Sequence, residues 1–104
     1  MRQLTPGEIY RSCIARWGHA SQIGMMYEEM AELICALNKF NRNPSDETRK
    51  NVCEEIADVE VMMGQARLIF GDDTTETIKQ YKLARLQLRL NQSPLNRESE
   101  AKGK

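Results

Sequence analysis

Residues 21–40, SQIGMMYEEMAELICALNKF, combine a helical apolar period with three closely spaced glutamates. The period predicts an amphipathic helix, and its apolar stripe comprises Ile23, Met26, Tyr27, Met30, Leu33, Ile34 and Leu37. A second stretch, Glu54-Glu55-Ile56-Ala57-Asp58, repeats the acidic pattern further along the chain. In each stretch two carboxylates lie three residues apart, which is close to one helical turn. Each pair therefore projects from one side of its helix.

Carboxylates at this spacing repel one another, and an unpaired carboxylate near a core is costly. An advance of about 100° per residue places Glu29 near the edge of its stripe, Glu55 within the stripe of its own helix, and Asp58 at the margin. Arg49 and Lys50 are the nearest basic candidates, but they lie at the start of the same helix. A divalent cation held between two helices resolves the conflict. The alternative is that the acids form salt bridges on the surface.

The lack of other ligands narrows the choice of ion. Mg²⁺ and Mn²⁺ prefer oxygen ligands, and carboxylates supply them. Zinc fits poorly, because the only histidine is His19 and the cysteines (Cys13, Cys35 and Cys53) lack ligand spacing. We interpret these cysteines as small core residues of a protein in a reducing compartment. The sequence therefore favours Mg²⁺, with Mn²⁺ as the other possibility.

Helix signals recur along the chain and strand signals are absent, so we expect an all-α fold. Thr5-Pro6-Gly7-Glu8 has the form of a capping box and opens a helix that ends about Trp17, before Gly18. We expect a second helix over about residues 21–40. A third helix is expected to begin after a cap at Ser45 or Asp46 and to end at Gly71. Asp73-Thr74-Thr75-Glu76 opens a fourth helix that ends about Leu90. We expect residues 1–91 to form a single domain and residues 92–104 to form a flexible polar tail.

The composition limits the classes of protein to which this chain can belong. The chain has 104 residues, of which 40% are hydrophobic and 29% charged, as in soluble globular proteins. No apolar run approaches the roughly 20 residues needed to cross a bilayer, and the N-terminus has no signal-peptide pattern, so we expect a cytoplasmic protein without membrane partners. A formal net charge of zero and the lack of interleaved aromatic and basic residues argue against nucleic acid as a partner.

The charges are nevertheless unevenly distributed, since acids dominate residues 28–60 and bases dominate from residue 78 onward. Lys82, Arg85 and Arg89 follow a spacing that makes one side of the last helix basic. They could pair with phosphates, with Lys39 as a weaker candidate. Alternatively, the basic residues neutralise the acidic helices or face solvent.

The acidic residues also carry a family resemblance. Glu28-Glu29-Met30-Ala31-Glu32 followed by Glu55-Ile56-Ala57-Asp58 resembles the EExxE…ExxD signature of MazG-like all-α NTP pyrophosphohydrolases. Trp17-Gly18 and Gln22 upstream agree with this, and Lys82-Leu83-Ala84-Arg85-Leu86 looks like the last helix of small, phage-type members. The resemblance covers roughly residues 10 to 90.

The resemblance implies a four-helix fold assembled as a homodimer or homotetramer. It also implies Mg²⁺-dependent hydrolysis of a nucleoside triphosphate to the monophosphate and pyrophosphate. The implied metal ligands are Glu29, Glu32, Glu55 and Asp58, with Glu28 as an auxiliary catalytic carboxylate. Gln22 lies in the region that contacts the nucleobase in the family, and Lys39, Lys82 and Arg85 complete the substrate-binding candidates.

Two other functions fit the same sequence. The first is a non-enzymatic helical module that oligomerises through its Met and Leu stripes, with the acids as a surface feature. The second is a regulatory nucleotide-binding protein that keeps the metal site but hydrolyses its nucleotide poorly.

Overall fold

The structure, a computed structural model, describes residues 2–92. These residues form four helices: α1 (Pro6–Trp17), α2 (His19–Arg42), α3 (Asp46–Phe70) and α4 (Asp72–Gln92). No strand occurs within residues 2–92, which confirms the predicted all-α class and the number of helices. The tail predicted for residues 92–104 lies outside the described residues, apart from Gln92 at the end of α4.

The start of α1 is fixed by the predicted capping box. The Glu8 backbone N–H donates to Thr5 Oγ1 at 3.2 Å, and the Thr5 backbone N–H donates to Glu8 Oε1 at 2.8 Å. This second bond and the ion pair with Arg2 lower the pKa of the Glu8 carboxyl below its usual value. At the other end, Gly18 adopts a φ of 89°, a value that favours glycine. It ends α1 and directly precedes α2, which starts two residues earlier than predicted.

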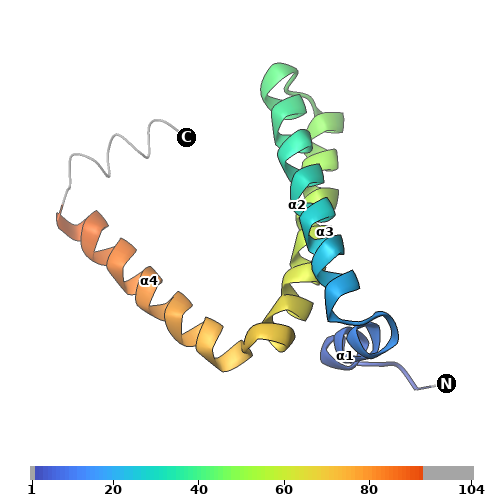
Figure 1. Cartoon of the computed structure of the whole chain (residues 1–104). Coiled ribbons are helices and arrows are strands. Elements are labelled where there is room, and N and C mark those ends of the chain that lie inside the picture. Colours follow the sequence, from blue (N-terminus) through green and yellow to red (C-terminus); the bar gives the residue numbers. More distant parts are fainter. Residues whose placement is uncertain (1, 93–104) are drawn as a thin grey trace. The chain divides into compact units, whose positions relative to one another are not determined.

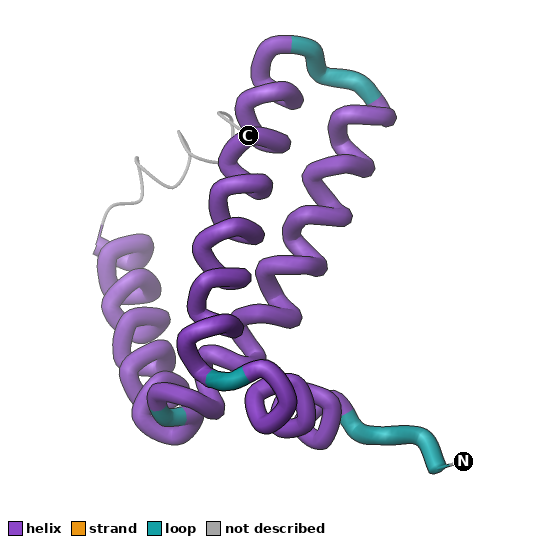
Figure 2. Tube along the Cα trace, turned by 45° about the vertical axis from the view of Figure 1, so that its right-hand side comes forward, coloured by secondary structure: helices purple, strands orange, loops and turns teal. Residues whose placement is uncertain are grey.

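α2 and α3 form an antiparallel hairpin and lie side by side along their length (Figure 1). A short loop joins them (Figure 2). Ser45, rather than Asp46, caps α3, because the Thr48 backbone N–H donates to Ser45 Oγ at 3.1 Å and the Ser45 N–H donates to Thr48 Oγ1 at 3.0 Å. Thr48 Oγ1 also donates to the Asn43 carbonyl oxygen at 2.9 Å. These bonds fix the loop end of the hairpin.

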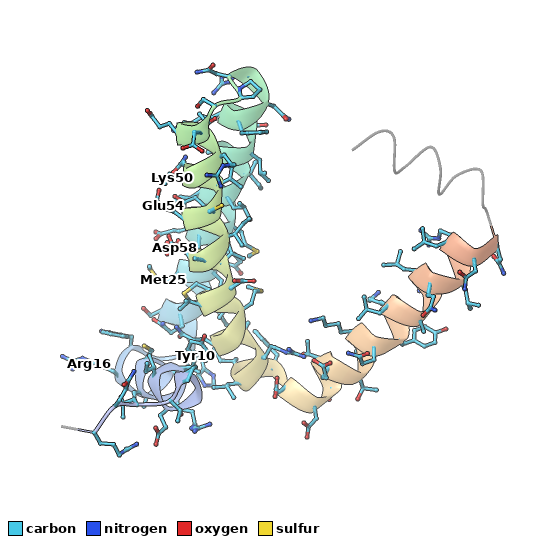
Figure 3. All side chains as sticks on the ribbon, turned by 180° about the vertical axis from the view of Figure 1, so that it is seen from behind. Tyr10, Arg16, Met25, Lys50, Glu54 and Asp58 are labelled. Atoms are coloured by element: carbon cyan, nitrogen blue, oxygen red, sulfur yellow. The ribbon has the colours of Figure 1, made fainter. Side chains whose placement is uncertain are left out.

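α1 packs against both helices of the hairpin, near the start of α2. Figure 3 labels Tyr10, which extends from α1 toward α3. Its ring lies against Gly64 so closely that a Cβ atom on residue 64 would overlap it. The absence of a side chain at this position is therefore what allows α1 to approach.

Gly71, with a φ of 130°, ends α3 as predicted. The chain divides here into two compact units, and α4 belongs to the second. α4 begins at Asp72, one residue before the predicted Asp73 cap, and contains no buried side chain. Among the described helices, none is long and apolar enough to pass through a membrane.

The core of the first unit is small. Within residues 2–92 the buried hydrophobic side chains are Met26, Ala36 and Met62. The predicted stripe of α2 is only partly covered, since Tyr27 is 68% and Ile34 60% exposed. The interpretation of the cysteines as core residues is wrong for two of them, because Cys35 and Cys53 are exposed and Cys13 is half-buried.

Candidate metal centre

Four carboxylates converge on the α2–α3 hairpin. Glu29 and Glu32 come from α2, and Glu55 and Asp58 come from α3. One oxygen of each lies within 4.8 Å of the others. The helices run antiparallel and each pair spans one turn, so Glu29 faces Asp58 and Glu32 faces Glu55 across the hairpin. Figure 3 shows Glu54 and Asp58 one turn apart on α3. Glu54 is not one of the four.

The cluster is partly removed from water. Glu29 and Glu55 are half-buried, whereas Glu32 and Asp58 are exposed. Glu29 Oε2 and Glu55 Oε1 are fully covered and have no hydrogen-bond partner. Removal from water raises the pKa of both the Glu29 and the Glu55 carboxyl groups, and the negative charges of Glu32 and Asp58 raise it further. The half-burial of Glu55 agrees with its predicted place in the apolar stripe of its helix.

The nearest bases do not compensate this charge. The guanidinium of Arg49 pairs with Asp46 at 2.8 Å and also contacts Cys53 Sγ. None of the ion pairs found within residues 2–92 includes a carboxylate of the cluster. These two ion pairs, Arg2–Glu8 and Arg49–Asp46, therefore do not support the alternative of salt-bridged surface acids.

The donor set fits a hard divalent cation. Mg²⁺ binds oxygen at about 2.0–2.1 Å, so two ligands on opposite sides of the ion lie about 4 Å apart. Four oxygens within 4.8 Å of one another can therefore close on one ion with small side-chain shifts. An octahedral ion held by these four would keep about two further positions for water or phosphate oxygens. The uncompensated oxygens of Glu29 and Glu55 are the ones that gain most from such an ion.

The remaining site candidates do not join this cluster. Glu28 is exposed and its oxygens are not among those that converge. Lys39 lies near the end of α2, where it lines a shallow hollow of about 330 Å³. Lys82 and Arg85 are exposed on α4, where they line another hollow of about 230 Å³ with Leu86 and Arg89. The roles of these residues in substrate binding stay predictions.

Gln22 occupies an unexpected environment. Its side chain is 6% exposed, and its Nε2 donates to Gln65 Oε1 at 2.7 Å. Gln65 is 3% exposed and was not among the predicted site residues. Gln65 follows Asp58 by seven residues just as Gln22 precedes Glu29 by seven, but this spacing carries a signal only once the register of the two helices is known.

Comparisons of this chain with protein-family models, with curated proteins and with solved structures each found no match.

Proposed function

We propose that this chain is a Mg²⁺-dependent nucleoside triphosphate pyrophosphohydrolase. The observation that carries the proposal is the cluster of four carboxylates, two of which present a buried oxygen without a hydrogen-bond partner. Such a cluster supports a site for a hard cation, for which we propose Mg²⁺ or Mn²⁺. The step from a cation site to this reaction depends on the resemblance of the two acidic motifs to MazG-like enzymes.

The cluster and the other candidate residues have separate tasks in this proposal. Glu29, Glu32, Glu55 and Asp58 hold the cation between α2 and α3. When bound, a divalent cation neutralises charge on phosphate oxygens and lowers the pKa of a coordinated water molecule. Glu28 directly precedes Glu29 in the sequence, and its side chain is exposed. In this proposal it accepts a proton from the attacking water. Lys82 and Arg85, on the basic side of α4, are by themselves groups of the kind that pair with phosphate oxygens.

A panel of ribo- and deoxyribonucleoside triphosphates tests the proposal. Each is incubated with the protein and Mg²⁺, and the monophosphate and pyrophosphate products are resolved by chromatography. We expect product from at least one nucleotide. Product formation should be lost when EDTA is added to the wild-type protein, and it should be lost in the variant Glu55→Gln. The matched control is Glu60→Gln, which removes an exposed acid of the same helix outside the cluster. No product from any nucleotide, with no rise in melting temperature on adding Mg²⁺, would overturn both the enzyme and the metal site.

The same experiment also tests a second function. If Mg²⁺ or a nucleotide stabilises the protein but no product forms, a regulatory nucleotide-binding protein becomes the better description. The same melting and product measurements therefore separate the two functions.

We also propose that a second copy of the chain covers the exposed apolar side chains of α2. Tyr27 and Ile34 expose most of their surface, and Leu37 is 46% exposed. A chain of this size with so few buried hydrophobic residues gains stability by burying such a face against a partner. This supports a homodimer or homotetramer.

A further inference from the structure

Gln22 and Gln65 form a buried polar contact between α2 and α3. The Gln22 amide nitrogen donates to the Gln65 oxygen at 2.7 Å, and the Gln65 amide nitrogen lies 3.9 Å from Met62 Sδ. Both glutamines are almost completely covered, although glutamine is a residue type that usually faces water. A hydrogen bond in this position is directional, and losing one partner would leave the other amide buried without it.

The pair lies in register with the acidic cluster. Gln22 precedes Glu29 by seven residues, and Gln65 follows Asp58 by seven. Because α2 and α3 run antiparallel, one register places Gln22 opposite Gln65 and Glu29 opposite Asp58. Seven residues at 1.5 Å each place the glutamine pair about 10 Å along the hairpin from the acids. The glutamine pair and the acidic cluster are therefore separated by about two helical turns.

The buried apolar side chains between the glutamine pair and the acidic cluster specify the register of α2 and α3 poorly. Met26 and Met62 are the buried residues next to the glutamines, and methionine is a flexible side chain that adapts to different surroundings. On the other side of the cluster, the Ser45 capping box fixes the loop end, about 15 Å from Glu55. A shift of one helical turn at the far end would move facing residues by about 5 Å. That distance is as large as the whole 4.8 Å span of the carboxylate oxygens.

We propose that the Gln22–Gln65 pair is a positioning element that holds α2 and α3 in the register at which the four carboxylates converge. Single buried polar contacts are known to fix register between helices where apolar packing alone does not. The consequence for metal binding rests on the proposed metal site, whereas the register is a property of the fold itself. In this positioning role, Gln22 needs no contact with a nucleobase.

Metal affinity is the first measurement. The variant Gln22→Leu/Gln65→Leu removes both amides together, so that neither is left buried alone. The control Met26→Leu changes a buried neighbour between the same two helices while nearly conserving volume, and it leaves both contacts of Gln65 in place. Mn²⁺ is titrated into each protein and the free ion is followed by electron paramagnetic resonance. We expect the glutamine variant to bind Mn²⁺ about tenfold more weakly or worse, the size of loss typical of supporting residues around metal sites. The control is expected to bind as the wild type does.

The register is measured independently of the metal. Spin labels are attached to cysteines introduced by Ser21→Cys on α2 and Glu60→Cys on α3, two exposed positions on the glutamine side of the cluster. Cys13→Ala, Cys35→Ala and Cys53→Ala remove the native thiols from this background. We expect a shifted or broadened label-to-label distance in the glutamine variant, and the wild-type distance in the methionine control. If the double Leu variant does not fold in EDTA, Gln22→Met/Gln65→Met provides the same comparison, because it also removes both amides together.

The outcomes separate this inference from the proposed function. A glutamine variant with the wild-type label distance and wild-type Mn²⁺ affinity would overturn the positioning role. If the wild type binds no Mn²⁺, the proposed metal site fails, and the label distances alone decide whether the glutamines set the register.

Discussion

Glu32 of α2 and Glu55 of α3 face one another across the hairpin, with carboxylate oxygens within 4.8 Å, although both are acids. Without a cation the two groups can approach only if one keeps a proton, which is why the pKa of Glu55 is raised by burial and by the charge of Glu32. The contact is therefore unfavourable in the metal-free protein near neutral pH and becomes favourable when a cation lies between the two side chains. Several measurable consequences derive from this relationship.

The first prediction concerns Glu55→Gln. A neutral amide can donate a hydrogen bond to Glu32 and removes one of the repelling charges, so the melting temperature in EDTA is expected to rise. The same change removes a proposed ligand, and Mn²⁺ affinity is expected to fall at least about tenfold. Differential scanning calorimetry with and without Mn²⁺ measures both effects. Glu60→Gln is the control, since Glu60 is an exposed acid of the same helix, and it should change neither. A Glu55→Gln protein that Mn²⁺ still stabilises fully would contradict the ligand assignment.

The second prediction is the pH dependence of the metal-free protein. The pKa values of Glu29 and Glu55 are raised in the fold above the 4.5 of the unfolded chain. The native state then binds more protons than the unfolded state, so the contribution of these groups to stability falls as pH rises from about 4.5 through their raised pKa values. Glu8 acts in the opposite direction because its pKa is lowered. Urea unfolding across this range in EDTA, done in a Glu8→Gln background, isolates the cluster.

Glu29→Gln/Glu55→Gln should flatten that pH dependence, because neither group can then titrate. A saturating divalent cation should reverse it, since metal binding displaces the protons. A metal-free protein whose stability rises with pH through the same range in the Glu8→Gln background would show that the carboxylates are not held against one another.

The convergence of the carboxylates could be predicted from the sequence because it depends on local rules. The apolar period of residues 21–40 and the three-residue spacing of Glu55 and Asp58 fix the helices and the direction of the pairs. The short loop at Asn43 then brings the two helices together. Periodicity reports which side of a helix is apolar, but not what covers that side. The exposure of Ile34, Tyr27 and Trp17 therefore had to come from the structure.

The Gln22–Gln65 contact could not be predicted for a related reason. Glutamine is usually exposed, so neither residue marks a core by its type. Their equal distance from Glu29 and Asp58 becomes informative only once the helices are known to run antiparallel with those acids facing each other. Tertiary register, rather than local propensity, carries that information.

The third prediction tests how α1 docks. Gly64→Ala places a methyl group in the space of the Tyr10 ring, and overpacking of this kind costs about 1–3 kcal/mol, offset by up to about 1 kcal/mol from better helix propensity. Gly24→Ala is the matched control, because a Cβ atom there meets nothing within 4 Å. It should stabilise the protein by up to about 1 kcal/mol. Urea unfolding monitored by circular dichroism measures both. Equal stabilisation by the two changes would show that Tyr10 does not pack on Gly64.

The fourth prediction concerns assembly. Ile34 is 60% exposed beside Tyr27 on the apolar side of α2, and a second copy that covers this side would exclude a charge from it. Light scattering at micromolar concentration should therefore give a mass at least twice the 12.0 kDa of one chain. Ile34→Glu should reduce the mass to that of a monomer, because an unpaired carboxylate is costly to bury. Cys35→Glu adds the same charge at the next residue, which points about 100° away, and should leave the assembly intact. A wild-type monomer, or an assembly insensitive to Ile34→Glu, would exclude this face as the contact between copies.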